Sequence, residues 1–314
     1  MSETADLQVG SLRPGAHRGY DVELSASGVA WIRFNQPERL NGLRQSMKRD
    51  LVETLVQAQM DDAVRVVVFI GSGRAFSAGD DISGRPVEGE PEGMVPDVGT
   101  GHHNSLGTYS GLRYLSQPLN QAVRGLNKLT VAAINGVAIQ TGFSLALCCD
   151  FRLAARSSRI GSATLRFGLL PDEGGQYLLV RTLGLPTAMD FLMRKRIVGA
   201  EEAQQLGLVH EVVEDDDLER RAGELAQELA EGPQVAMRLL KRSLYNAADL
   251  SWEQALDEIA SKTPIADHHP DAREGVEAFQ QKRRPRFNRW LEPTPDSASS
   301  AEHSADSTPE DRDA

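Results

Sequence analysis

Short apolar segments and helical patterns alternate along the first two thirds of the chain. Residues 21–24 and 29–34 are separated by Ser27-Gly28, and the second of them alternates apolar and polar residues, which predicts a β-hairpin. Residues 46–60 carry apolar side chains at helical spacing. The run at residues 65–70, which is continuously apolar from Val66 onward, predicts a buried strand, so the order strand, helix, strand indicates an α/β fold.

Residues 129–154 form a mainly apolar segment around which we expect the rest of the chain to be organised. Residues 130–134 predict a strand, and Asn135-Gly136 predicts a tight turn after it. Gln140-Thr141-Gly142 opens a helix that is apolar nearly all round and is therefore expected to be buried. The free N–H groups and positive dipole end of its first turn suit an oxygen that becomes negative. A packing helix of an α/β core would show the same pattern.

The periodicity becomes purely helical toward the C-terminus. Further helical segments are predicted at residues 109–126, 176–183, 185–194 and 200–206, with β-like segments at 157–167 and 207–213. Four amphipathic helices are predicted at residues 218–231, 234–247, 251–262 and 271–284. Ser251-x-x-Gln254 and Asp271-x-x-Glu274 are typical of helix starts.

Both ends of the chain are polar and lack an apolar pattern. We therefore predict a disordered leader at residues 1–19, an α/β core at 20–214, a helical C-terminal domain at 215–290 and a disordered acidic tail at 291–314. No apolar run reaches the length of a membrane span, and the first residues show no secretory signal.

Charge and cysteine content narrow the possible partners. The 314 residues carry a formal net charge of −11, which argues against binding to nucleic acid or to anionic membranes. The cysteines are Cys148 and Cys149, which are neighbours on a helix and do not easily bridge each other, as expected for a cytoplasmic protein.

Residues 84–107 are rich in Gly and Pro and predict a mobile loop beside the candidate site. The adjacent His102 and His103 lack nearby cysteines or spaced carboxylates, so we predict no metal site.

Five segments, in order, resemble the crotonase (enoyl-CoA hydratase/isomerase) superfamily. They are NQPERLN at residues 35–41, GSGRAFSAGDDI at 71–82, AINGVAIQTGFSLALCCDFRLA at 133–154, GLLPDEGGQYLLVRTLG at 168–184 and DAREGVEAFQQKRRPRF at 271–287. The resemblance runs from about residue 22 to residue 287. It implies a crotonase-like spiral of ββα repeats, C-terminal helices that build a homotrimer or hexamer, and acyl-CoA thioester substrates. Coenzyme A would be part of the substrate, and no separate cofactor is expected.

The resemblance also implies an oxyanion hole that stabilises a thioester enolate. By position, its two donors are the backbone N–H groups of Asp80 and Thr141. Many relatives have three glycines where this chain has Gln140-Thr141-Gly142, so the Thr141 side chain is a departure from the family pattern.

The acids depart further from that pattern. Ser144 and Thr164 replace the two glutamates that hydratases of the family use to activate water and deliver a proton. Glu173 and Asp172 match the single catalytic acid of two groups of enoyl-CoA isomerases in the superfamily. Either acid would also suit the start of the following helix as a cap.

The resemblance places coenzyme A against two parts of the chain. The backbone at Ala78, Asp80 and Ile82 matches positions that meet the adenine. Phe279 and Lys282 match positions that reach the nucleotide, often from a neighbouring subunit. The basic run that begins at Lys282 also fits a solvated helix end.

These residues favour a one-acid enoyl-CoA isomerase. The alternatives are an enoyl-CoA hydratase or an acyl-CoA hydrolase with non-standard acids, because the turn at residues 168–179 also resembles that of hydroxyisobutyryl-CoA hydrolases. A non-catalytic acyl-CoA-binding protein that kept the fold is a further alternative.

Overall fold

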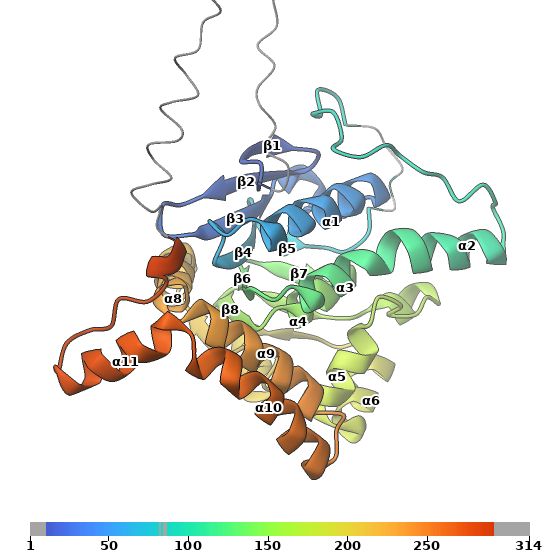
Figure 1. The fold of residues 1–314 in the computed structure, drawn as a ribbon. Coiled ribbons are helices and arrows are strands. Elements are labelled where there is room, and N and C mark those ends of the chain that lie inside the picture. The colour runs from blue at the N-terminus through green and yellow to red at the C-terminus, as the bar shows by residue number, and fades with distance from the viewer. Residues whose placement is uncertain (1–10, 82, 84–86, 292–314) are drawn as a thin grey trace, which may run out of the picture. The chain divides into compact units, whose positions relative to one another are not determined.

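The computed structural model describes residues 11–81, 83 and 87–291 (Figure 1). The chain divides after Ala230 into two compact units. The first contains the strands and the helices up to α8, and the second contains the later helices. This division falls one helix later than the predicted start of a helical domain at residue 215.

Within the described residues, the larger sheet of the first unit has seven strands in the order β1-β2-β3-β4-β6-β8-β11. The first three pair antiparallel, and β3 to β11 pair parallel. Their bounds are β1 Gly15–His17, β2 Tyr20–Leu24, β3 Val29–Phe34, β4 Val66–Gly71, β6 Leu129–Ile134, β8 Phe151–Ala155 and β11 Glu211–Val213. The predicted hairpin and the two buried strands are thereby confirmed, since β4 and β6 are buried along their whole length.

The described residues form a second sheet of four strands in the order β10-β9-β7-β5. Its strands are β5 Ala75–Ser77, β7 Val137–Ile139, β9 Arg159–Gly161 and β10 Ile197–Gly199. Three pairs of strands follow each other directly in the chain, namely β4/β5, β6/β7 and β8/β9. In each pair the first strand belongs to the larger sheet and the second to the smaller sheet. This repetition, with helices after each pair, is the predicted spiral of ββα turns.

The turn at Asn135 holds two of these strand pairs together. Its side-chain oxygen accepts a hydrogen bond from the Gly71 N–H at 3.0 Å, and its amide donates to the Gly73 carbonyl at 2.8 Å. A side-chain carbon on Gly136 would lie 2.2 Å from the Arg74 carbonyl oxygen, so glycine is required there. The predicted turn therefore also fixes where the two sheets separate.

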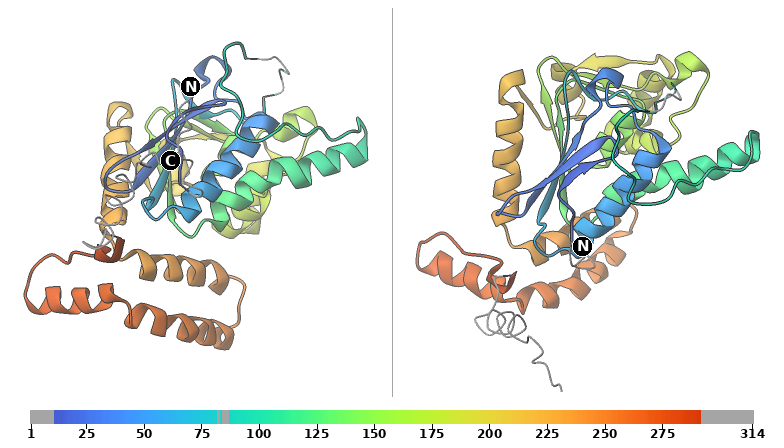
Figure 2. Two further views of the ribbon diagram at one scale, coloured as in Figure 1. Left: turned by 45° about the horizontal axis from the view of Figure 1, so that its top comes forward. Right: turned by 90° about the horizontal axis from the view of Figure 1, so that it is seen from above.

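Helices cover both faces of the larger sheet. Figure 2 shows α1 and α3 on one face and α8 along the other. The helices of this unit are α1 Gln45–Met60, α2 Ser105–Gly111, α3 Gln117–Gly125, α4 Thr141–Cys148, α5 Gly175–Leu183, α6 Leu185–Met193, α7 Ala200–Gln205 and α8 Leu218–Glu231. Every residue of α4 is buried, which confirms the prediction for this helix.

The helix predicted at residues 109–126 is longer and less regular than expected. It consists of α2, a π-helical segment at Leu112–Ser116, and α3, which follow one another without a break. The π-helical turn ends at Ser116, which is buried. Wide turns of this kind often occur at functional sites.

Residues 11–19 are ordered, contrary to the prediction of a disordered leader that extends to residue 19. They include β1, which pairs antiparallel with β2. Gly19 adopts a φ of 85°, which permits the tight turn between the strands, and the His17 ring stacks on Tyr20 at 5.0 Å. Tyr20 is fully buried and fixes this hairpin to the core.

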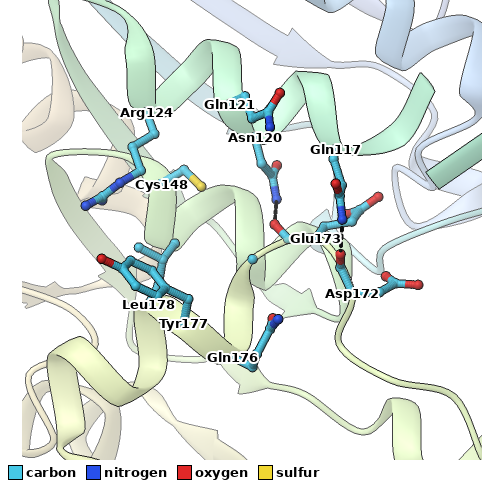
Figure 3. A pocket seen from close by; sticks show the side chains of 11 residues that line it. Gln117, Asn120, Gln121, Arg124, Cys148, Asp172, Glu173, Gln176, Tyr177 and Leu178 are labelled. Atoms are coloured by element: carbon cyan, nitrogen blue, oxygen red, sulfur yellow. Dashed lines mark hydrogen bonds between the residues drawn. The ribbon is translucent and has the colours of Figure 1, made fainter. Parts of the chain in front are cut away.

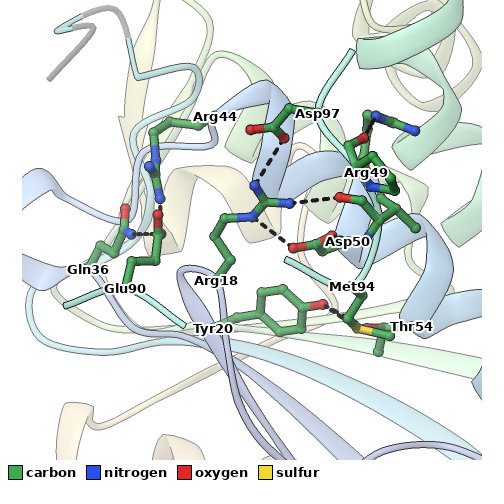
Figure 4. Close-up of polar contacts among 12 residues, drawn as sticks. Arg18, Tyr20, Gln36, Arg44, Arg49, Asp50, Thr54, Glu90, Met94 and Asp97 are labelled. Atoms are coloured by element: carbon green, nitrogen blue, oxygen red, sulfur yellow. Dashed lines mark hydrogen bonds and ion pairs between the residues drawn. The ribbon is translucent and has the colours of Figure 1, made fainter. Parts of the chain in front are cut away.

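The described part of the predicted loop at residues 84–107 is attached to α1 and to the N-terminal hairpin. Arg18 forms ion pairs with the buried Asp50 and with Asp97, each at 2.9 Å (Figure 4). Asp50 also accepts a hydrogen bond from the Val95 N–H at 3.1 Å, and Arg44 pairs with Glu90. The mobility of this segment stays a prediction.

The second unit contains α9 Gln234–Ala247, α10 Trp252–Asp267 and α11 Pro270–Gln280. Ser251 and Gln254 form the predicted capping box of α10. The predicted start of α11 at Asp271 is wrong, because the helix begins at Pro270 and the His269 side chain caps it. Asp271 is instead buried and accepts a hydrogen bond from the Asn288 N–H at 2.8 Å.

Candidate active site

Two chain segments meet at the start of α4. Gly79 follows β5 and adopts a φ of 93°, and its carbonyl accepts a hydrogen bond from the Leu43 N–H at 2.8 Å. A side-chain carbon on Gly79 would lie 3.1 Å from the Thr141 nitrogen. A side-chain carbon on Gly142 would lie 2.3 Å from the Ser77 carbonyl oxygen. The glycines thus allow the backbone after β5 to lie directly against the first turn of α4.

The backbone N–H groups of Asp80 and Thr141 belong to these two segments. Thr141 is the first residue of α4, where N–H groups have no partner within the helix. Within the described part of the chain, neither N–H has a hydrogen-bond acceptor. Two free donors on adjoining segments are what an oxyanion hole requires, and that role stays a prediction.

The Thr141 side chain joins the same two segments. Its hydroxyl donates a hydrogen bond to the Asp80 carboxylate at 2.7 Å. Glycine at position 141 could not form this contact. The threonine that replaces a glycine of the family pattern therefore has a structural effect, because its side chain holds Asp80 against the start of α4.

Lys48 lies at the centre of the site, although no motif in the sequence predicted a role for it. Its side chain on α1 is fully buried. The ammonium donates to Asp80 Oδ1 at 2.7 Å, to Glu173 Oε1 at 2.5 Å, and to the Ser116 hydroxyl. A lysine ammonium has three donors, so all of them are used.

Glu173 lies in the turn before α5, and its side chain is only 2% exposed. Oε1 accepts hydrogen bonds from both Lys48 and Ser116, and the Glu173 carbonyl accepts from Asn120 at 2.8 Å. Among the described residues, Oε2 has no hydrogen-bond partner. Gly174 occupies the cap position of α5 without a side-chain cap, so Glu173 does not cap this helix.

The charges of the cluster set its protonation. Burial raises the pKa of Glu173 above its ordinary value; Lys48 acts to lower it, and the negative charge of Asp80 adds to the increase. Burial acts to lower the pKa of Lys48, but Asp80 and Glu173 outweigh this effect and raise it. Lys48 therefore stays protonated, while Glu173 binds a proton at higher pH than an exposed glutamate does.

Asp172 is the second acid of the turn and, unlike Glu173, is exposed to solvent. The partial desolvation of its carboxyl group by the surrounding protein raises the pKa of that group, and the charge of Asp80 acts in the same direction. The Asp172 carbonyl accepts a hydrogen bond from Gln117 at 2.8 Å, and Figure 3 shows both this bond and the one from Asn120 to Glu173. Residues of α3, this turn and α5 line a cavity of about 240 Å³, which also reaches Cys148.

The two positions that hold glutamates in hydratases are occupied by hydroxyl side chains here. Ser144 is buried on α4, where a side-chain carbon on Gly175 would lie 2.3 Å from its Oγ. Thr164 begins a short 3-10 helix, and its hydroxyl lies 3.4 Å from that of Ser162. Neither residue supplies a carboxylate.

The predicted contacts to coenzyme A lie partly in each unit. Ala78 donates its N–H to the Leu40 carbonyl at 2.9 Å, and Ile82 lies outside the described residues. Phe279 is 85% exposed on α11, and Lys282 follows that helix with its N–H bonded to the Phe279 carbonyl at 3.2 Å. The binding roles of these residues stay predictions.

The sequence model of the enoyl-CoA hydratase/isomerase family matches residues 25–290. The chain belongs to this family. It is 35% identical over 260 residues to 1,2-epoxyphenylacetyl-CoA isomerase of Escherichia coli (strain K12), with 83% of this chain and 95% of that protein covered. It is 29% identical over 255 residues to 4-chlorobenzoyl coenzyme A dehalogenase-2 of an Arthrobacter species, with 81% and 88% covered.

The fold is shared with solved structures of the family. The structure of enoyl-CoA hydratase from Bacillus anthracis matches with a TM-score of 0.77 and 29% identity, covering 86% of this chain and 98% of that one. The predicted family and crotonase-like fold are thus confirmed, and the protein is an acyl-CoA enzyme of the enoyl-CoA hydratase/isomerase family. No helix among the described residues is long and apolar enough to cross a membrane. The names of the relatives include an isomerase, a hydratase and a dehalogenase, so membership alone leaves the reaction open.

Proposed function

We propose that this family member is a one-acid enoyl-CoA isomerase that uses Glu173. The observation that carries the proposal is the buried Glu173 carboxylate, which has one oxygen held by Lys48 and Ser116 and one oxygen without a partner among the described residues. Ser144 and Thr164 replace the two glutamates that hydratases of the family use to add water. A single acid suffices when a proton only moves between two carbons of one enolate.

The steps follow from the chemistry of the thioester. Glu173 takes a proton from the α-carbon of a 3-enoyl-CoA, and the electron pair of that C–H bond moves to the thioester oxygen. The N–H groups of Asp80 and Thr141 stabilise this enolate, with each donor contributing about 2.7–4 kcal/mol. Glu173 then returns the proton to the γ-carbon, so the double bond moves into conjugation with the thioester and no water is consumed.

The test compares two substrates of equal chain length. Purified enzyme is given a 3-enoyl-CoA, and formation of the conjugated thioester is followed by its absorbance. The same enzyme is given the corresponding 2-enoyl-CoA, and loss of that absorbance through hydration is followed. We expect turnover of the first substrate and no hydration of the second. Hydration as the faster reaction would contradict the proposal.

A hydratase or hydrolase with non-standard acids is the second candidate, because Asp80 places another carboxylate on the same lysine. The Asp80 side chain is 44% exposed, so water or substrate can reach it. Hydration needs one group to activate water and one to deliver a proton, and Asp80 with Glu173 would form that pair. Hydration in the substrate test that is lost in both Asp80→Asn and Glu173→Gln would favour this candidate.

The binding of coenzyme A is proposed to involve Phe279 and Lys282 together with the backbone at Ala78 and Asp80. Although the chain is acidic overall, Lys282 would offer a cation to the phosphates of coenzyme A. The protein would form a homotrimer or hexamer in which neighbouring subunits share the site. Coenzyme A is part of the substrate, and we propose no further cofactor.

We predict that Lys282→Glu weakens coenzyme A binding about tenfold or more, because it replaces a cation near phosphates with an anion. Lys195→Glu is a matched control, since Lys195 and Lys282 have the same left-handed backbone, with φ values of 56° and 54°. Isothermal titration with coenzyme A measures both variants. Equal affinities in the two variants would remove Lys282 from the proposed site.

A further inference from the structure

The buried Lys48 makes contacts that do not follow from the family pattern. Lys48 Nζ contacts three groups that come from three separate elements. Ser116 ends the π-helical segment, Glu173 lies before α5, and Asp80 follows β5. A fully buried ammonium is retained only where its partners satisfy it. The three contacts therefore fix the positions of these side chains relative to one another.

The hydrogen bonds also decide which oxygen of Glu173 can exchange a proton. Oε1 accepts from Lys48 and from Ser116, so both of its acceptor positions are used. Oε2 is buried and has no partner among the described residues. A proton that binds to Glu173 must therefore be carried on Oε2.

The titratable groups around Glu173 act in opposite directions on its ionised form. Lys48 on α1 stabilises the carboxylate, whereas Asp80 and Asp172 place negative charge in the same region. Cys148 on α4 also faces Glu173, but burial raises the pKa of its thiol to about 12, so it stays neutral. Lys48 is thus the group that offsets both burial and the charge of Asp80 on Glu173.

We propose that Lys48 is a positioning residue that keeps Glu173 ionised in the free enzyme and presents Oε2 as its proton-accepting atom. This inference rests on the proposed role of Glu173 as the base. Without the ammonium, the buried Glu173 carboxylate would lie close to the negative Asp80 with no cation between them, and Glu173 would bind a proton instead. Removing the Asp80 charge would have the opposite effect, because one of the opposing anions disappears.

The first measurement is the pH dependence of kcat/KM for the 3-enoyl-CoA. A base must be deprotonated, so activity falls as the pH drops through the pKa of Glu173. In Lys48→Met, which keeps a long side chain without the charge, we expect this acid limb to move to higher pH by about one to three units. In Asp80→Asn, which retains the backbone N–H, we expect it to move to lower pH. A purely structural role would change kcat or stability without these opposite displacements.

The second measurement does not depend on the reaction. Infrared titration of the free protein follows the carbonyl band of protonated carboxyl groups, and the component that is absent from Glu173→Gln belongs to Glu173. We expect the pH at the midpoint of this Glu173 component to rise in Lys48→Met and to fall in Asp80→Asn. If the isomerase assay fails but these midpoints move as expected, the proposed function is wrong and the ionising role of Lys48 stands.

Unchanged midpoints would overturn the inference, whatever happens to turnover. Lys48→Met leaves the buried Glu173 and the partly exposed Asp80 without their cation, and this variant can fail to fold. Asp80→Asn then decides alone, because Asp80 is partly exposed and the substitution preserves its shape. A midpoint for Glu173 that stays at the wild-type pH in Asp80→Asn would show that the three charges are not coupled.

Discussion

Replacing Glu173 with Gln is expected to lower kcat for isomerisation of a 3-enoyl-CoA by about 10²–10⁴-fold, the usual contribution of a positioned acid or base. Gln keeps the size of the side chain, and its carbonyl oxygen can still accept the hydrogen bonds of Lys48 and Ser116. It has no group that takes a proton at neutral pH. The dissociation constant of a non-reacting acyl-CoA should stay unchanged, because the substitution does not alter the groups that bind coenzyme A.

Asp172→Asn is the matched control for this prediction. Asp172 is the neighbouring acid, and the structure gives it no contact with Lys48 among the hydrogen bonds of the described residues. We expect this variant to retain most of the wild-type turnover. Full activity in Glu173→Gln would eliminate Glu173 as the base, and loss of activity only in Asp172→Asn would transfer the role to Asp172.

Replacing Arg18 with Met is expected to lower the free energy of unfolding by about 3–5 kcal/mol, the cost of leaving a buried charge without its partner. The Asp50 side chain is fully buried, and Arg18 Nε lies 2.9 Å from its Oδ2. Arg18 also contacts Asp97, so the described residues around Val95 would lose part of their attachment. Urea unfolding followed by circular dichroism measures the change.

Arg49→Met serves as the control for this second prediction. Arg49 precedes Asp50 on α1, and it contacts only the Pro96 carbonyl among the hydrogen bonds of the described residues. We expect its loss to cost less than about 1 kcal/mol, as for other exposed polar contacts. Equal unfolding free energies for the two variants would mean that the Arg18–Asp50 pair contributes no more than a surface contact.

Periodicity predicted the elements of this fold where their apolar pattern was continuous. The strands β4 and β6 and the helix α4 are buried throughout, and each is a run of apolar residues in the sequence. The arrangement of β4/β5 and β6/β7 in two sheets followed only from the resemblance, because no local pattern states which sheet a strand joins. The strand β1 was missed, since it contains Gly15, Ala16 and His17 and no apolar alternation.

Lys48 shows why the site was predicted only in part. It stands three residues before Leu51 and seven before Leu55, so it lies on the apolar stripe of α1. A lysine in that stripe is a signal that a buried anion lies opposite. The sequence does not reveal which anion, because Asp80 and Glu173 are 32 and 125 residues away from Lys48 along the chain. Asp80 was predicted for its backbone alone, as an oxyanion-hole donor and as a contact to the adenine, and its carboxylate acquired a role only from the structure.

The π-helical turn before α3 has a consequence for how this enzyme could arise and be recognised. A π-helical turn is equivalent to an α-helix with one residue inserted. Deleting a single residue from Leu112–Ser116 would restore regular α-helical winding and change which side chains of this turn point toward Glu173. The contact of Ser116 with Glu173 therefore depends on a length change in the gene as well as on residue identity. Relatives that share this geometry should differ from the others by a gap at this place in an alignment, a signature that a comparison of catalytic residues alone would overlook.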